Sequence, residues 1–229
     1  MTMKVRKRKK PQSAKPRTKS KQKRRRKTNQ DPVPRDLREA VVMAIDPGTH
    51  RLGWSVSRVY LEGGEIRRDW LARGSVFGKG KGCSLISGIA AQVRDIQKLH
   101  KVDVLAIEDY IFIPGRSSGI FAVPALIGVL KHEWYTRTWR EPIMIEPSVW
   151  KKIVCNNGNA NKMDVLDSLG RFLSEEEILD IHDEFKKHKL KEFQDPQDCF
   201  DAIAIDLYVF LSIQRYMKEE EVLLNGEEL

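Results

Sequence analysis

Apolar residues recur along this chain with two distinct periods, and each period predicts a different kind of element. Short runs that are apolar throughout, or at every second position, predict five β-strands. These strands cover residues 40–46, 53–60, 66–75, 102–108 and 143–145. Apolar residues spaced by three and four positions predict helices. These helices cover approximately residues 84–100, 120–138, 163–173 and 198–216.

The order of these elements predicts the architecture. Three strands come first, separated by turns that contain glycine, and helices and strands then alternate toward the end of the chain. Such an order builds an antiparallel meander that extends into a mixed five-stranded sheet with helices on both faces. Residues 174–193 are strongly charged but keep helical spacing, which predicts a peripheral helix or a lid.

Charge divides the chain into parts. Residues 1–30 contain fifteen of the 41 Lys and Arg residues and no acidic residue. The other 26 basic residues stand against 32 acidic ones, so the rest of the chain has a net charge of −6 although the whole chain carries +9. We predict a disordered basic arm over residues 1–35, because it has too few apolar residues to bury a core. A folded domain over 36–217 and an acidic tail over 218–229 complete the prediction.

The basic arm is expected to contact a polyanion, most simply nucleic acid, since runs of like charge seldom pack into a fold. Its densest run consists of Lys23, Arg24, Arg25, Arg26 and Lys27. An inert solubility tail and, in a eukaryote, a nuclear localisation signal are the alternatives. No stretch of the sequence approaches the roughly 20 apolar residues that span a membrane. The three cysteines are isolated, which favours a reducing compartment.

Four acidic residues carry the strongest functional signal. Asp46 and Glu108 each end a predicted apolar strand, while Asp198 and Asp201 lie three residues apart at the start of the last helix. Unpaired charges are costly at such positions. Gathered together, four carboxylates would form a site for two hard divalent cations about 4 Å apart, Mg²⁺ or Mn²⁺. This predicts metal-assisted phosphodiester chemistry, with raised and coupled pKa values in the empty site.

The motifs around these acids resemble those of RuvC-type Holliday junction resolvases, which have a ribonuclease H-like fold. The similar segments are the opening strand and hairpin IDPGTHRLGW (45–54), the second acidic motif LAIE (105–108) and the closing helix DCFDAIAI (198–205). A basic stretch, PSVWKK at 147–152 followed by GNANK at 158–162, is similar as well. The resemblance covers about residues 40–215.

The resemblance implies an α/β protein with a ribonuclease H-like mixed sheet. It also implies that the protein is an Mg²⁺-dependent endonuclease, which resolves four-way DNA junctions by paired nicks as a homodimer. It implies two Mg²⁺ ions per active site, for which Mn²⁺ would substitute, and Lys162 as a catalytic residue beside the four acids. Neither a membrane nor a small-molecule cofactor is expected as a partner. We expect a phage or viral enzyme that works in the host cytoplasm, with a nuclear or organellar eukaryotic enzyme as the alternative.

Basic residues near the acids predict contacts with the DNA backbone. Lys151, Lys152 and Lys162 would contact phosphates near the scissile bond, where a cation also offsets developing negative charge. Arg51, which follows the first acidic motif, is a weaker candidate for a backbone contact. Solvated surface lysines are the alternative for these positions.

The segment after Glu108 departs from the family. The family places an aromatic wedge there, whereas Tyr110 and Phe112 lie one position to either side of the expected place. They would either stack on bases or belong to the core. Gly48 and Gly53 would either permit close approach of DNA or serve tight hairpin geometry.

Alternatives from other functional classes remain. A less selective branched-DNA (fork or flap) endonuclease would use the same acids, and a non-catalytic nucleic-acid-binding protein would keep only the fold. Residues 46–49 also match the Asp-x-Gly-Thr phosphate loop of actin-like phosphotransferases. That fold needs a duplicated domain, for which 229 residues without an internal repeat leave no room.

Overall fold

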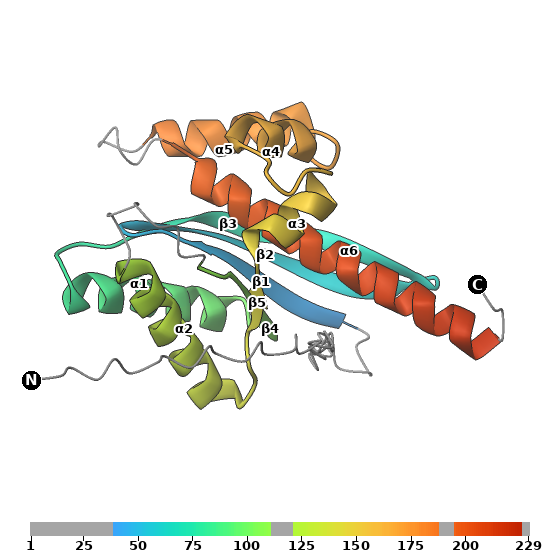
Figure 1. The fold of residues 1–229 in the computed structure, drawn as a ribbon, viewed down its shortest axis with the longest axis horizontal. Helices are drawn as coiled ribbons and strands as arrows, with labels where there is room; N and C mark the ends of the chain where they lie inside the picture. Colours follow the sequence, from blue (N-terminus) through green and yellow to red (C-terminus); the bar gives the residue numbers. More distant parts are fainter. Residues whose placement is uncertain (1–38, 111–120, 188–194, 226–229) are drawn as a thin grey trace, which may run out of the picture. The chain divides into compact units, whose positions relative to one another are not determined.

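The computed structural model describes residues 39–110, 121–187 and 195–225, with side chains described as far as residue 218. Its centre is a sheet of five strands in the order β3-β2-β1-β4-β5 (Figure 1). The strands are β1 (Glu39–Pro47), β2 (Arg51–Glu62), β3 (Glu65–Phe77), β4 (Val104–Glu108) and β5 (Ile143–Ile145). β1, β2 and β3 pair antiparallel, whereas β4 and β5 run parallel to β1. The predicted mixed five-stranded sheet is confirmed.

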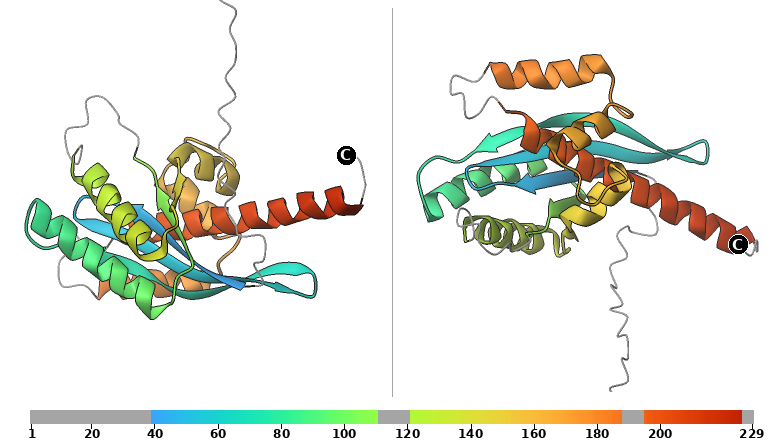
Figure 2. Two further views of the ribbon diagram at one scale, coloured as in Figure 1. Left: turned by 90° about the horizontal axis from the view of Figure 1, so that it is seen from below. Right: turned by 45° about the horizontal axis from the view of Figure 1, so that its top comes forward.

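Six helices flank the sheet in the described part of the chain. They are α1 (Cys83–Leu99), α2 (Ala122–Thr138), α3 (Pro147–Val154), α4 (Lys162–Leu169), α5 (Glu175–Lys186) and α6 (Gln197–Asn225). Figures 1 and 2 show α1 and α2 on one face of the sheet and α3 to α6 on the other. Among these six, none has both the length and the apolar character to cross a membrane.

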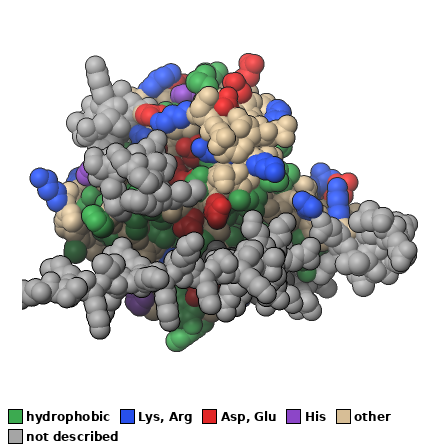
Figure 3. Space-filling view, viewed as in Figure 1, with side chains coloured by type: hydrophobic (Ala, Val, Ile, Leu, Met, Phe, Trp, Pro, Cys, Tyr) green, Lys and Arg blue, Asp and Glu red, His purple; other side chains and the backbone are tan. Residues whose placement is uncertain are grey.

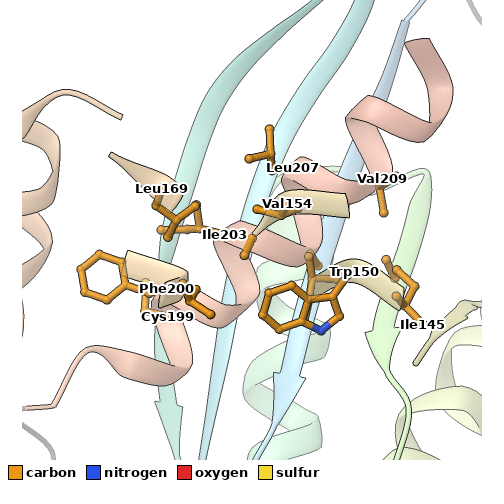
Figure 4. Packing of buried hydrophobic residues seen from close by; sticks show 14 of the residues in the cluster. Ile145, Trp150, Val154, Leu169, Cys199, Phe200, Ile203, Leu207 and Val209 are labelled. Carbon is orange, nitrogen blue, oxygen red and sulfur yellow. The ribbon is translucent and has the colours of Figure 1, made fainter. Parts of the chain in front are cut away.

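The two faces of the sheet have separate cores, because side chains alternate between the faces along each strand. Met43 and Ile45 of β1 pack with α1 and α2, whereas Val42 and Ala44 pack beneath α6. The core on the α6 face also contains Trp150 of α3, which Figure 4 shows among its apolar neighbours. The alternation therefore decides which side chains of β1 and β4 face α6.

Several boundaries differ from those predicted. The last helix continues to Asn225 instead of ending at residue 216, and the predicted helix 163–173 already ends at Leu169. The short helix α3 stands where a loop was expected. Its eight residues contain only two buried apolar positions, Trp150 and Val154, which is too few to reveal a helical period.

The charged stretch 174–193 contains a mostly exposed helix, α5, which agrees with the predicted peripheral helix. Ser174 begins α5 with a capping box: its side chain accepts a hydrogen bond from the backbone N–H of Glu177, whose carboxylate accepts one in return. Ile181 and Phe185 of this helix are buried in the core on the α6 face. The predicted basic arm, the loop with Phe112 and residues 188–194 lie outside the described residues.

Candidate active site

Asp46 and Glu108 lie at the carboxyl ends of adjacent parallel strands. β1 and β4 are paired residue by residue as far as Ile45 and Ile107, so the next step in this register brings Asp46 level with Glu108. In each strand the residue two positions earlier is an alanine buried beneath α6. Because side chains two positions apart on a strand share a face, both carboxylates are directed to the α6 side of the sheet.

The other two acids lie at the start of α6, Asp198 in the first turn and Asp201 three residues later. The first turn approaches β2 closely because Gly53 has no side chain: a Cβ atom there would lie 1.8 Å from the carbonyl oxygen of Asp198. At Gly48 a Cβ atom would instead lie 2.2 Å from the carbonyl oxygen of Arg51. Gly48 therefore serves the hairpin, as one of the two interpretations held, whereas Gly53 serves helix packing, which neither interpretation included.

The acids influence one another's ionisation. The pKa of Asp46 is raised well above its ordinary value, first by burial and then by the negative charges of Glu108, Asp201 and Asp198. Burial also raises the pKa of Asp201 to about 7, with repulsion from Glu108 and Asp198 adding to the rise and a hydrogen bond from Gln197 opposing it. Protonation therefore removes part of the negative charge near neutral pH, and a bound cation would have the same effect.

Three of the acids each accept a hydrogen bond from one neighbouring side chain. The pairs are Trp150 Nε1 with Glu108 Oε1 at 2.8 Å, Gln197 Nε2 with Asp201 Oδ1 at 2.9 Å, and Arg51 Nε with Asp198 Oδ2 at 2.5 Å. Two of these donors are neutral and one is a cation. The site thus restrains the orientation of its carboxylates while neutralising the charge of Asp198 alone through a salt bridge.

Arg51 is directed toward this site. Besides its bond to Asp198, it donates through Nη1 to the carbonyl oxygen of Asp195 at 2.7 Å. Its side chain is 14% exposed, which leaves little of the guanidinium accessible from outside. The position of Arg51 in this structure is that of a counter-ion to Asp198.

Four carboxylates are the type of side chain that binds a hard divalent cation, although in this structure they are not arranged as a complete set of ligands. Carboxylate oxygens are the ligands that Mg²⁺ and Mn²⁺ prefer, and a cation would relieve the repulsion that acts on Asp46 and Asp201. Within the described residues, no three His, Cys, Asp or Glu side chains are grouped so that they could hold an ion as they stand. Asp198, paired with Arg51, would have to exchange that partner before it became a ligand.

Proteins of known identity resemble this chain in sequence. No protein-family model matches it. The crossover junction endodeoxyribonuclease RuvC of Synechococcus sp. (strain RCC307) is 29% identical to it over 172 residues, which cover 72% of this chain and 95% of that protein. Over most of both sequences, the chain is therefore similar to RuvC.

Solved structures share the fold of this chain. The Thermus thermophilus RuvC structure aligns with a TM-score of 0.55 and 23% identity, over 75% of this chain and 95% of that one. T. thermophilus RuvC in complex with a Holliday junction substrate aligns with a TM-score of 0.54 and 21% identity, over 74% of this chain and 92% of that one. The predicted ribonuclease H-like fold class is therefore confirmed.

The predicted phosphate contacts lie on α3 and α4. Lys151 and Lys152 belong to α3, and the charge of Lys151 opposes the raised pKa of Asp201. Lys162 begins α4, with its side chain 70% exposed and its Nζ 3.8 Å from the carboxylate of Asp195. Figure 3 shows that basic and acidic side chains are interspersed on the face that it displays. All three lysines are therefore carried by α3 and α4.

The structure describes only one of the two candidate aromatic residues after β4. Tyr110 is half-buried and packs against the core on the α1 and α2 face, which is the core interpretation of this residue. The remaining candidates lie outside the described residues: Phe112, Lys23, Arg24, Arg25, Arg26 and Lys27. Their contacts with DNA stay predictions.

Sequence reasoning missed three polar side chains. Trp150 and Gln197 donate hydrogen bonds to two of the acids. No periodic pattern marks the bond between Trp150 and Glu108, which lie 42 residues apart, whereas Gln197 precedes Asp201 by four residues on one helix, a spacing that could have revealed their contact. Asp206 of α6 is fully buried against β2, where it accepts hydrogen bonds from Ser55 Oγ at 2.9 Å and Ser57 Oγ at 2.7 Å. An acid inside the apolar run of the last helix was the signal that could have revealed it.

Proposed function

We propose that this protein is a metal-dependent endonuclease that resolves four-way DNA junctions by paired nicks. The observation that carries the proposal is the meeting of Asp46, Glu108 and the first turn of α6 at one end of the sheet. Similarity to a crossover junction endodeoxyribonuclease supports the reaction, and the T. thermophilus complex with a Holliday junction supports the substrate.

The four acids, Asp46, Glu108, Asp198 and Asp201, are the residues that would hold the metal, which we propose to be two Mg²⁺ ions with Mn²⁺ as a substitute. Bound in this way, such ions would supply an activated water and stabilise the leaving 3′-oxygen. The fold of the protein holds the four carboxylates close together despite their mutual repulsion. The strand register sets Asp46 beside Glu108, and the absence of a side chain at Gly53 admits the first turn of α6.

Three lysines are proposed to contact the DNA backbone next to the acids. Lys151, Lys152 and Lys162 lie on the two short helices that border the site, and Lys162 carries an exposed ammonium group. A cation here would bind phosphate and offset the charge that develops in the transition state. Lys162 is the lysine that we assign to catalysis.

Paired nicks require two active sites, so we propose a homodimer that cuts opposite strands symmetrically. The basic arm over residues 1–35 would add affinity that does not depend on DNA sequence, since it contributes fifteen positive charges and no negative one within its first thirty residues. In this proposal the nuclease domain spans residues 36–217 and supplies the selectivity for branched DNA.

The proposal is tested with labelled four-way junction, three-way junction, flap and linear duplex DNA, each in Mg²⁺ or EDTA. We expect symmetric paired nicks in the four-way junction only, and only with Mg²⁺. Asp46→Asn and Glu108→Gln should abolish cleavage and preserve junction binding, which also excludes a contaminating nuclease. Cleavage of every branched substrate would instead indicate a less selective branched-DNA nuclease. Binding without cleavage in either condition would indicate a non-catalytic nucleic-acid-binding protein.

A further inference from the structure

Trp150 is a buried side chain whose one polar atom reaches the candidate active site. Its side chain has no exposed surface and packs in the α6-face core near Ile145 and Val154 (Figure 4). The indole Nε1 donates a hydrogen bond to Glu108 Oε1 at 2.8 Å. The apolar body of the ring is therefore held by the core, and its N–H is held against a carboxylate at the end of β4.

This hydrogen bond is not a general requirement for burying tryptophan in this fold. The Nε1 atoms of Trp54 and Trp134 are also buried, and neither has a hydrogen-bond partner among the described residues. The fold thus tolerates a buried indole N–H without an acceptor at two other places. The contact of Trp150 with Glu108 therefore needs an explanation beyond the packing of a large ring.

The surroundings of Glu108 supply that explanation. Its charge acts on Asp46 and on Asp201, and its carboxyl group also forms a hydrogen bond with that of Asp46. That bond needs a shared proton, so when Asp46 is ionised the like charges would turn the three rotatable bonds of the glutamate side chain away from the site. An indole N–H restrains the carboxylate without placing a second positive charge there, whereas Arg51 at Asp198 forms a salt bridge that opposes metal binding.

We propose that Trp150 is a positioning residue for Glu108, holding its carboxylate toward the other acids so that it can take part in the cleavage reaction. This inference rests on the proposed nuclease function and deepens it by assigning a role that the sequence motifs do not include. Trp150 itself touches neither DNA nor the reacting atoms. Its effect is exerted through one carboxylate oxygen of Glu108.

The test compares Trp150→Phe with Trp134→Phe in the full-length protein. Each change keeps a large aromatic ring and removes an N–H, but only the N–H of Trp150 has an acceptor. The measurements are single-turnover cleavage of a four-way junction in Mg²⁺, junction binding in EDTA, and Mn²⁺ binding by electron paramagnetic resonance. For Trp150→Phe we expect cleavage and Mn²⁺ affinity to fall about 10- to 100-fold, with junction binding unchanged. Trp134→Phe should match the wild type in all three.

A second variant separates the missing N–H from any change in packing. Replacement of residue 150 with benzothienylalanine keeps the size and shape of the indole and puts sulfur in place of the N–H, and it should reproduce the loss seen with phenylalanine even if Trp150→Phe folds poorly. Wild-type cleavage and Mn²⁺ affinity in this isostere would overturn the positioning role and leave the nuclease function intact. Absence of cleavage by the wild-type protein would overturn the nuclease function, and the positioning role with it.

Discussion

Replacement of Gly53 by alanine tests the close contact between α6 and β2 that brings two of the acids into the site. The new Cβ atom would lie 1.8 Å from the carbonyl oxygen of Asp198, 2.2 Å from its carbonyl carbon and 2.8 Å from the backbone nitrogen of Cys199. Ordinary contacts of a Cβ atom begin at 3.4 Å, so the first distance would have to grow by 1.6 Å, the difference between 3.4 and 1.8. All three atoms belong to the backbone, so a change of rotamer cannot relieve the overlap.

We expect Gly53→Ala to lower the free energy of unfolding by about 3 kcal/mol, the upper part of the usual range for over-packing, because a whole helix end must move. In a domain of this size that loss corresponds to a fall in Tm of about 6–12 °C. Junction cleavage should fall about 100-fold, since a displacement of more than an ångström moves Asp198 and Asp201 away from Asp46.

Thermal and urea unfolding measure the stability change, and single-turnover cleavage measures the effect on the site. Gly128→Ala is the matched control, because Gly128 is exposed on α2 and a Cβ atom there would meet nothing within 4 Å. That change should stabilise the protein by about 0.5–1 kcal/mol, since alanine favours a helix over glycine. A Gly53→Ala protein with the Tm and cleavage rate of the wild type would refute our account of this contact.

Three further changes test the charges of the protein. In urea titrations with EDTA, Arg51→Gln should lower the free energy of unfolding by about 1–2 kcal/mol after allowance for solvent screening, because Asp198 loses its partner. The control Arg58→Gln breaks a more exposed pair on the same strand and should lower the free energy of unfolding much less. Equal losses in the two variants would contradict the counter-ion role of Arg51. Burial raises the pKa of Asp206 from 3.8 to about 6, so its ionisation opposes folding: wild-type stability should fall as pH rises from about 4 to about 6 and stay lower above. Asp206→Asn should remove that part of the fall and gain about 3 kcal/mol at pH 7, and parallel stability curves for the two proteins would show that Asp206 does not titrate in this way. Deletion of residues 1–30 should weaken binding to junction and duplex DNA alike and reduce the salt dependence of binding, whereas an unchanged salt slope would remove the arm from the interface.

The architecture could be predicted because its signals are local. A period of two residues distinguishes a strand and a period near 3.6 distinguishes a helix, so the order of strands and helices can be read along the chain. Asp46 and Glu108 could be singled out for the same reason, since each ends an apolar run where a charge is costly. Short elements escape this reasoning: α3 has two turns and too few apolar positions to show a period.

Two partners of the acids, Trp150 and Arg51, could not be predicted, because they lie far along the chain from the carboxylates that they bind. Gly53 was interpreted within its own hairpin, and only the packing of α6 on β2 shows that it meets the backbone of Asp198. Arg51 was interpreted as a DNA contact, yet it lies 147 residues from the aspartate that it binds. Such contacts follow from how whole elements pack, and a pattern of residues along one element does not contain them.

By itself, the sequence determined the order of the elements, the two faces of the sheet and the four acids, since each of these follows from the character of neighbouring residues. Only the tertiary structure decided how Glu108 and Asp198 are held, by an indole from α3 and a guanidinium from β2. The physical reason is that a hydrogen bond acts over about 3 Å in space whatever the separation along the chain. Elements must therefore be packed before the partners of these two carboxylates are defined.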